Sequence, residues 1–152
     1  MTVARIYNNN NEDAKDVLQE AFVLVYKKID DFEGQKEAAL FGWIKRIIIN
    51  ISLSRNQRMY RKMEGSIEDK HFSLGKDAEA LSQMAHEEIM DLIFSLPDGY
   101  RQVFAMYAIE GYSHKEIGEK LDIKESSSRS QYMRSRKMLQ KKIANLANVL
   151  SA

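Results

Sequence analysis

The chain has 152 residues, of which 44% are hydrophobic and 30% charged, with seven Gly, a single Pro and no Cys. This length allows one hydrophobic core or two small ones of about 60 residues each, and the scarcity of Gly and Pro favours helices. The composition excludes disulfides, and no stretch approaches the run of roughly 20 apolar residues that spans a bilayer. Nothing at the N-terminus resembles a signal peptide, so we expect a soluble, cytoplasmic protein.

The net charge of +1 conceals a partition along the chain. Residues 1–63 hold 11 basic and 8 acidic side chains (+3), residues 64–96 hold 2 and 8 (−6), and residues 97–152 hold 10 and 6 (+4). Two basic ends suit a chain that contacts a polyanion at two separate places. The acidic middle is also typical of a flexible linker.

A polar break at residues 8–11 precedes the first strongly periodic segment. Asn11 is a candidate N-cap, followed by the acidic first turn that a helix dipole prefers. The apolar residues that recur at helical spacing, and that we expect to be buried, are Ala14, Val17, Leu18, Ala21, Phe22, Val25 and Ile29. The opposite face carries Asp16, Gln19, Glu20 and Val23, which by themselves indicate a solvated surface.

A loop over residues 30–39, with Gly34 and five charged side chains, separates this helix from a second one expected from Leu40 to about Arg61. The buried stripe of the second helix consists of Leu40, Ile44, Ile47, Ile48 and Ile51. Another face carries Trp43, Arg46, Asn50, Ser54, Arg58 and Arg61. An aromatic ring beside a line of cations is typical of single-stranded nucleic acid binding, because rings stack on bases and cations follow the backbone. Burial of Trp43 in the core fits the pattern equally well.

Residues 63–80 lack a sustained period and predict a linker. An amphipathic helix follows from about Leu81 to Phe94, and Pro97 ends it because the residue before proline is disfavoured in a helix. Pro97 then suits the first turn of a further helix that stops at Gly111. The residues that this helix should bury are Val103, Phe104 and Tyr107.

A helix-turn-helix pattern occupies the rest of the chain. Ser113 and Glu116 have the spacing of a capping box. Gly118 weakens the helix by about 1 kcal/mol relative to Ala unless another helix approaches closely at that point. A break at residues 122–124 leads to a last helix from about Glu125 to about Val149, whose inner face holds Ser128, Tyr132, Ser135, Leu139 and Ile143.

The outer face of this last helix predicts contact with DNA. Between Lys124 and Lys142 there are seven Lys or Arg residues and one acid. Short hydroxyl side chains followed by cations suit a helix whose first turns meet base edges and whose later turns meet phosphates. A solvated helix face is the alternative. The candidate residues are Ser126, Ser127, Arg129, Ser130, Gln131, Arg134, Lys137 and Lys141.

Four segments together resemble a known family: DAKDVLQEAFVLVYKKIDDF at 13–32, FGWIKRIIIN at 41–50, LPDGYRQVFAMYAIEGYSHKEIGEKLDI at 96–123, and the basic helix after them. In order and spacing they are similar to the group 4, extracytoplasmic-function sigma factors over nearly the whole chain. The resemblance implies an all-α fold of two small helical domains joined by an acidic linker. A region 2-like domain would occupy residues 1–62, the linker 63–80, and a four-helix, helix-turn-helix region 4-like domain 81–152.

The resemblance also implies a transcription initiation factor, without catalysis or a cofactor of its own, that directs core bacterial RNA polymerase to promoters. The first domain would bind the clamp helices of the largest catalytic subunit through Asp16, Gln19 and Glu20. It would capture the minus-ten element with the loop from Phe32 to Leu40 and with Trp43, Arg46, Asn50, Arg58 and Arg61. The last helix would read the minus-thirty-five element through its candidate residues. An anti-sigma factor is a further candidate partner, and no membrane contact is expected.

Some positions depart from the family pattern. Ser54 and Gln57 stand where the family usually has Asp and Arg, which puts contacts there in question. Asp122 replaces a usual Gly in the turn, although Asp tolerates the left-handed conformation better than most residues. Ser128 replaces an apolar β-branched residue, so we expect looser packing under the recognition helix. Met1 lies where the family is already inside its first helix, so part of that helix is expected to be missing, which would expose Phe22 or Val25.

No catalytic or metal-binding pattern competes with this interpretation. His71, His86 and His114 lack metal-ligand spacing, and a surface position or a minor-groove-side role is expected for His114 rather than a metal. The sequence has no glycine-rich phosphate loop. Two other hypotheses remain: a stand-alone helix-turn-helix regulator with an N-terminal interaction or dimerisation domain, and a helical adaptor that binds only protein. Run-off transcription with core polymerase separates the sigma hypothesis from both.

Overall fold

The computed structural model describes residues 2–8, 10–34, 36–62 and 86–150, and within these it describes residues 58–62, 86 and 147–150 as backbone only. The chain divides into two compact units, Met1–Gly65 and Ser66–Ala152, called here the N-terminal and the C-terminal unit. In the described ranges the secondary structure is helical and contains no strand, which confirms the all-α expectation. No helix in these ranges is long and apolar enough to cross a membrane. The expected linker, residues 63–80, lies outside them.

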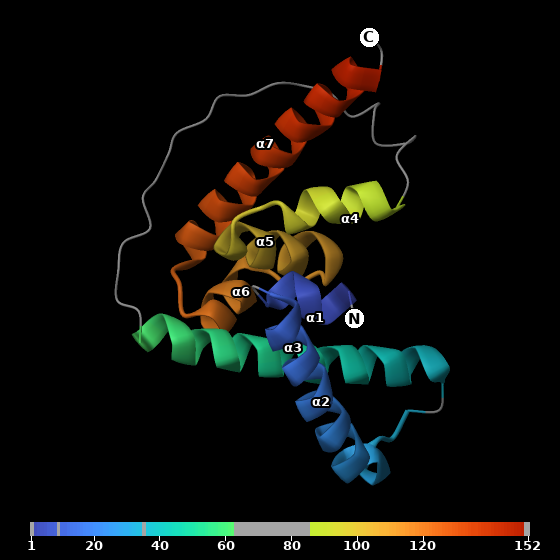
Figure 1. The fold of residues 1–152 in the computed structure, drawn as a ribbon. Helices are drawn as coiled ribbons and strands as arrows, with labels where there is room; N and C mark the ends of the chain where they lie inside the picture. Colours follow the sequence, from blue (N-terminus) through green and yellow to red (C-terminus); the bar gives the residue numbers. More distant parts are fainter. Residues whose placement is uncertain (1, 9, 35, 63–85, 151–152) are drawn as a thin grey trace. The chain divides into compact units, whose positions relative to one another are not determined.

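Three α-helices and one short 3-10 turn form the described part of the N-terminal unit: α1 (Thr2–Tyr7), α2 (Asn11–Lys28), η1 (Ile29–Asp31) and α3 (Glu37–Lys62). α2 crosses α3, and α1 packs on both (Figure 1). The core at this crossing consists of Ala4, Ala14, Val17, Ala21 and Ile48. Small side chains on α1 and α2 let these helices approach α3 closely.

Both predicted helix starts in this unit are slightly wrong. The N-cap of α2 is Asn10 rather than Asn11, because the Asp13 backbone N–H donates to Asn10 Oδ1 at 2.8 Å. α3 begins at Glu37, three residues before the predicted Leu40. Residues 37–39 are exposed and carry one Glu and two Ala, so they show no hydrophobic period that a pattern could detect.

Helix α1 agrees with the resemblance, which places Met1 inside the family's first helix, and buried amide side chains hold it in place. Asn8 Nδ2 donates to the Ala4 carbonyl at 2.6 Å and to Ser52 Oγ at 3.0 Å. Asn56 Nδ2 donates to the Tyr7 carbonyl at 2.5 Å. A helix this short is not stable in isolation, because nucleation is unfavourable. Its contacts with α3 therefore determine its structure.

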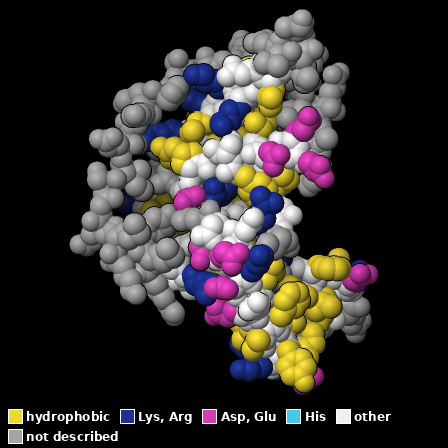
Figure 2. Space-filling model, viewed as in Figure 1, with side chains coloured by type: hydrophobic (Ala, Val, Ile, Leu, Met, Phe, Trp, Pro, Cys, Tyr) yellow, Lys and Arg dark blue, Asp and Glu magenta, His cyan; other side chains and the backbone are white. Residues whose placement is uncertain are grey.

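Only part of the expected apolar face of α2 is buried. Ala14, Val17 and Ala21 are buried as predicted, whereas the burial predicted for Phe22 is wrong, since this side chain is 63% exposed. At about 100° per residue, Phe22 is rotated out of the line of the buried alanines. The expected exposure of Phe22 is thus observed, while Val25 is half-buried. Hydrophobic side chains gather at the lower right in Figure 2. In the described part of this unit the exposed large hydrophobic side chains are Phe22, Val23, Tyr26, Ile29 and Phe41.

The C-terminal unit contains α4 (His86–Phe94), α5 (Asp98–Phe104), the π-helical turn η3 (Ala105–Ile109), α6 (His114–Leu121) and α7 (Glu125–Leu150). α4, α5 and α6 pack against the long helix α7 (Figure 1). The predicted inner face of α7 is confirmed, with Tyr132 half-buried and Ser128, Ser135, Leu139 and Ile143 buried. Residues 81–85, the expected start of α4, lie outside the described residues.

A buried arginine joins α4 to α5. Arg101 Nη1 donates to the Leu96 carbonyl at 3.0 Å and to the Phe94 carbonyl at 3.3 Å, and its Nη2 donates to Asp98 Oδ1 at 2.7 Å. The guanidinium therefore satisfies carbonyl groups at the end of α4, which would otherwise lack helical partners. The sequence did not indicate this role.

The expected single helix from Pro97 to Gly111 is instead α5 followed by η3. The Glu110 N–H donates to the Ala105 carbonyl at 3.0 Å, a bond that spans five residues as in a π-turn. Gly111 then ends the helix with φ +77°, where its lack of a side chain avoids strain, so the predicted stop is confirmed. The wider turn alters the rotation of the helix before the chain enters α6.

Candidate nucleic-acid and polymerase interfaces

The turn between α6 and α7 forms as the sequence predicts. Ser113 Oγ accepts from the Glu116 N–H at 3.2 Å, and Glu116 Oε2 accepts from the Ser113 N–H at 2.8 Å, which completes the capping box. The Ser113 hydroxyl also donates to Glu116 Oε2, at 2.7 Å. The bonds that the carboxylate accepts from the Ser113 backbone N–H and from this hydroxyl hold the pKa of Glu116 below its usual value. Asp122 adopts the left-handed conformation, with φ 57° and ψ 45°. A Cβ at Gly118 would lie 2.8 Å from the Ile123 carbonyl oxygen, so the close approach is confirmed.

His114 is buried under this turn, and its predicted surface position is wrong. Its ring stacks on Tyr107, with centroids 4.2 Å apart and planes 9° apart, and its Nδ1 lies 3.0 Å from Ser128 Oγ. Burial lowers the pKa of His114, the Arg129 charge lowers it further, and the Glu125 carboxylate opposes both. Ser128 is fully buried and its hydroxyl meets His114, so a hydrogen bond occupies the place of the family's usual apolar side chain, and the looser packing stays a prediction.

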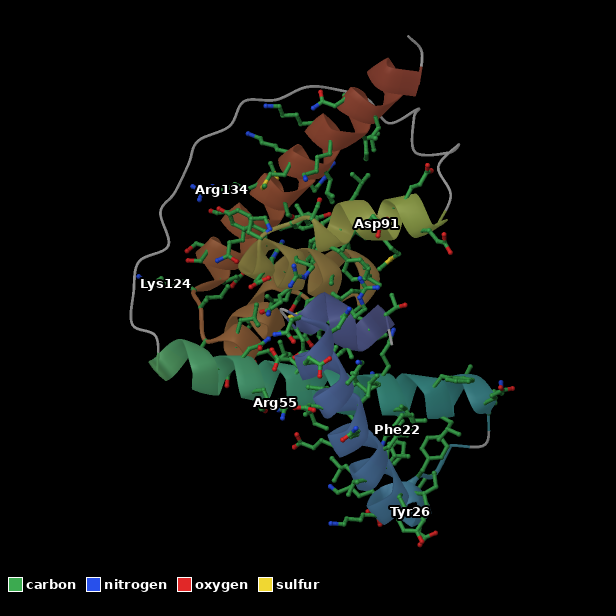
Figure 3. The ribbon with its side chains drawn as sticks, in the orientation of Figure 1. Phe22, Tyr26, Arg55, Asp91, Lys124 and Arg134 are labelled. Atoms are coloured by element: carbon green, nitrogen blue, oxygen red, sulfur yellow. The ribbon has the colours of Figure 1, made fainter. Side chains whose placement is uncertain are left out.

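The α7 residues predicted to meet DNA lie on the outer side of the helix. Ser126, Arg129 and Ser130 are exposed, while Ser127, Gln131, Arg134 and Lys137 are partly exposed. Figure 3 shows Lys124 and Arg134 extending to the same side of α7. This side combines hydroxyl groups near the helix N-terminus with cations farther along, the arrangement that base and phosphate contacts require.

Some side chains on this side of α7 already interact within the unit. Arg129 forms an ion pair with Glu125 one turn earlier. Ser130 Oγ donates to the Ser126 carbonyl at 3.0 Å. Gln131 lies near α5, because a Cβ at Gly99 would be 3.6 Å from its Oε1. Arg129 would therefore have to exchange Glu125 for a DNA group in a complex.

The minus-ten candidates occupy α3 of the N-terminal unit. Trp43 is half-buried and lies against Phe32, with ring centroids 5.4 Å apart, so it is neither wholly core nor a free platform. Phe32 in turn lies over Gly34, where any side chain would clash with its ring. Arg46 and Asn50 are exposed. The backbone of α3 includes Arg58 and Arg61, whose side chains lie outside the described residues.

The acidic candidates on α2 are exposed but not isolated. Asp16 Oδ2 lies 3.6 Å from Arg55 Nη2, and Glu20 Oε2 lies 3.8 Å from Arg55 Nε. Gln19 is exposed beside them. Sequence analysis missed this role of Arg55, because its partners lie on another helix far away in the chain.

Exposed apolar side chains continue this surface of α2, and among them sequence analysis expected only the exposure of Phe22. Phe22 points away from the helix, and Tyr26 is 84% exposed one turn later (Figure 3). At helical spacing Gln19, Val23 and Tyr26 follow one another along one face. The detectable signal was Val23, an apolar residue on a face that is otherwise polar.

The C-terminal unit has an apolar groove between α4, the segment from α5 to η3, and α7. Ile89, Leu92, Phe104, Tyr132, Leu139 and Ile143 are among the residues that line it. In the described residues no group of three or more His, Asp or Glu side chains is arranged to hold a metal ion.

Comparison with known proteins matches each unit to a defined sequence family. Residues 1–62 match Sigma-70 region 2, and residues 86–139 match Sigma-70, region 4. The ECF RNA polymerase sigma-E factor of Escherichia coli (strain K12) is 28% identical over 146 residues, covering 88% of this chain and 75% of the relative. The sigma-E factor of Haemophilus influenzae is 27% identical over 154 residues, covering 90% and 78%. The sigma factor RpoE of Bartonella quintana, solved in complex with the anti-sigma factor NepR, has a similar fold, with a TM-score of 0.52 at 17% identity over 91% of this chain and 86% of that one.

Proposed function

Because the chain belongs to the sigma-70 family as an extracytoplasmic-function RNA polymerase sigma factor, we propose how its surfaces divide between core polymerase and promoter DNA. The protein is a transcription initiation factor that directs polymerase to promoters. In our proposal the N-terminal unit binds the clamp helices of the largest subunit and captures the minus-ten element. The C-terminal unit reads the minus-thirty-five element, an anti-sigma factor regulates the protein, and its work is done in the cytoplasm.

The observation that carries this proposal is the geometry of α6, the turn and α7. The capping box fixes the start of α6, and Asp122 turns the chain into α7. Ser126, Ser127 and Ser130 then lie in the first turns of α7, where a recognition helix meets base edges. Arg134 and Lys137 lie farther along, where they would meet phosphates, together with Arg129 and Gln131 on the flanks.

Minus-ten capture is assigned to the N-terminal part of α3. Arg46 and Asn50 are exposed on the side of α3 to which Trp43 belongs, as helical spacing predicts. The ring of Trp43, already supported by Phe32, offers a partly exposed aromatic surface on which an unpaired base could stack. Arg58 and Arg61 extend this assignment along the same helix.

Polymerase binding is assigned to the exposed face of α2. Asp16, Gln19 and Glu20 provide its polar part, and Phe22 and Tyr26 add apolar area beside them. An exposed apolar patch with a polar border is typical of a protein contact surface. The two acids suit a positively charged partner, because opposite charges steer association and exclude wrong partners.

Run-off transcription with core polymerase, on promoter and non-promoter templates, tests the function as a whole. The polymerase surface is tested by the variant Asp16→Arg with Glu20→Arg. We expect its helical circular dichroism and thermal midpoint to match the parent, since exposed charges contribute about 0 to 1 kcal/mol each to stability. Its affinity for core polymerase should fall by about two orders of magnitude or more, because facing like charges cost several kcal/mol.

A matched control reverses two acids at the same spacing elsewhere. Glu87 and Asp91 are exposed and one turn apart on α4, where Figure 3 labels Asp91. The variant Glu87→Arg with Asp91→Arg makes the same change in net charge and should bind core polymerase like the parent. If Asp16→Arg with Glu20→Arg also bound core polymerase as tightly as the parent does, the hypothesis of a stand-alone regulator would be favoured.

A further inference from the structure

Arg55 reaches from α3 to α2 and lies beside both acids of the proposed polymerase contact (Figure 3). Its guanidinium is 3.6 Å from Asp16 and 3.8 Å from Glu20, at the atoms given above. Both distances exceed those of a hydrogen bond, so the attraction is Coulombic and has no fixed geometry. The side chain of Arg55 is 37% exposed and those of the acids are 59% and 58% exposed. Pairs of this kind are weak and can exchange one cation for another.

Arg55 lies on a different face of α3 from the residues assigned to minus-ten DNA. At about 100° per residue, Arg55 lies roughly 120° around α3 from the line through Trp43 and Asn50. Its contacts are with the acids of α2, not with the aromatic and amide side chains of the minus-ten face. Its positive charge therefore acts on the surface that we assign to the polymerase.

Two acids with one cation between them attract a positively charged partner less than the two acids alone would. A partner cation that approaches Asp16 and Glu20 must also come close to the guanidinium of Arg55. Like charges brought together at an interface oppose binding, and a smaller negative patch steers association less effectively.

We propose that Arg55 competes with core polymerase for Asp16 and Glu20, and so holds the affinity of this sigma factor below the value that its acids alone would give. This inference rests on the proposed function, because it needs α2 to be the polymerase-binding helix. Arg55 is then a residue that tunes affinity from beside the interface. Core polymerase binds when its own cations displace Arg55 from the pair of acids.

The test measures the dissociation constant of the full chain and core polymerase for the parent and for Arg55→Gln. Removing the competing charge should lower Kd by about two- to fivefold, the range that corresponds to an exposed ion pair. The ratio of the two constants should shrink toward one as salt is raised, because exposed charges are screened over about 8 Å at physiological ionic strength. A purely structural role for Arg55 would produce weaker binding and no such salt dependence.

Two further variants separate the position of the charge from its mere presence. Arg55→Lys keeps a cation beside Asp16 and Glu20 and should bind core polymerase like the parent. Lys28→Gln removes one positive charge from α2 eight residues, or about 12 Å along the helix axis, beyond Glu20, and it should also resemble the parent. If Lys28→Gln tightened binding as much as Arg55→Gln, the gain would reflect net charge and the proposal would be wrong.

The double reversal of Asp16 and Glu20 distinguishes failure of this inference from failure of the proposed function. Loss of core binding in that reversal, together with tighter binding by Arg55→Gln, supports both. Loss of binding in the reversal with unchanged or weaker binding by Arg55→Gln overturns the competition and leaves the polymerase surface in place. If the double reversal binds core polymerase as well as the parent does, α2 is not the polymerase-binding surface, and the proposed competition by Arg55 fails with that assignment.

Discussion

The side-chain hydrogen bonds beside the two proposed interfaces of this sigma factor differ in their range along the chain. In the C-terminal unit the capping box joins residues three apart, and the bond between His114 and Ser128 spans 14 residues. In the N-terminal unit Asn8 reaches Ser52 across 44 residues, and Asn56 reaches Tyr7 across 49. The proposed DNA-reading element can therefore form largely from its own segment. The proposed polymerase-binding unit forms only when both ends of its chain have come together.

This difference also separates the two proposed interfaces. The outer side of α7 takes its chemistry from a single helix, and its internal ion pair, between Arg129 and Glu125, is local. The acidic surface of α2 is composite, because Arg55 on α3 modifies it. We expect mutations in α3 to change polymerase binding without touching the partner, whereas DNA reading should depend mainly on α7 itself.

The largest effect that we expect on stability comes from breaking a long-range contact of the N-terminal unit. In Asn56→Ala the Tyr7 carbonyl loses the donor at 2.5 Å inside a buried site. Leaving a buried acceptor without that bond should lower the free energy of unfolding by about 1 to 3 kcal/mol. Hydrogen exchange should accelerate over residues 2–7, while exchange over residues 113–143 stays as in the parent.

Ser54→Ala is the control for this prediction, because Ser54 is an exposed neighbour on the same helix. Its effect should stay within about 0.5 kcal/mol, as is usual for surface substitutions. Equal destabilisation by both variants, or faster exchange in α6 and α7 of the Asn56 variant, would contradict the division into separately stabilised units.

A smaller effect, confined to the C-terminal unit, should follow pH through His114. Its folded pKa lies below the ordinary value of 6.5, because burial and Arg129 disfavour the charged ring. The stability that the neutral ring provides is therefore complete above pH 6.5 and is lost as pH falls through 6.5 toward the folded pKa. Thermal midpoints measured from pH 8 to pH 5.5 should decline in the parent. In His114→Phe, which can keep the stack on Tyr107, this dependence should disappear.

The capping box predicts a second pH range, more acidic than the first, over which the stability of the C-terminal unit declines. The pKa of Glu116 is lowered by its hydrogen bonds from Ser113, so this contribution is present above pH 4.5 and is lost as pH falls through the folded pKa. Glu116→Gln should remove the acidic window and leave the decline below pH 6.5 unchanged. If His114→Phe and Glu116→Gln abolished the decline of stability over the same pH range, one shared group would be responsible for it.

The features that the sequence predicted correctly are those fixed by neighbouring residues. Ser113 and Glu116 determine their own hydrogen bonds, Gly118 allows the approach of the Ile123 carbonyl, and Asp122 can adopt the left-handed turn because its side chain is short and polar. The inner face of α7 was predictable for the same reason, since its period is local. The positions of the α7 candidates followed from that inner face.

The features that the sequence did not predict depend on partners selected by the tertiary fold. Asn56 resembled any polar residue on a helix, and Arg55 and Arg101 resembled ordinary surface cations. His114 seemed to be a surface residue because the ring above it, Tyr107, is positioned by a π-turn that no sequence period revealed. An apolar side chain at helical spacing can also remain exposed, as Ile29 does.

The smallest stability effect concerns Phe22, and it should be small because the helix has two apolar sides with different roles. Val17 is fully buried against α3, whereas Phe22 is 63% exposed only five positions later. Val17→Ala deletes two buried methyl groups and should cost about 2 kcal/mol. Phe22→Ala deletes a larger side chain, yet it should change the free energy of unfolding by no more than about 0.5 kcal/mol, as for other surface substitutions.

The affinity for core polymerase should show the opposite order, with the larger loss in Phe22→Ala and the smaller in Val17→Ala. Phe22 lies in the apolar part of the surface that we assign to the clamp helices, and aromatic side chains at such contacts often cost more than 1 kcal/mol of binding energy when truncated, about fivefold or more in Kd. Val17→Ala, measured well below its thermal midpoint, should bind like the parent because the buried valine cannot reach a partner. Large destabilisation by Phe22→Ala would mean that its ring packs in the core in solution. Unchanged stability with unchanged polymerase binding would instead leave the aromatic part of α2 without a role in the polymerase contact and restrict that contact to Asp16, Gln19 and Glu20.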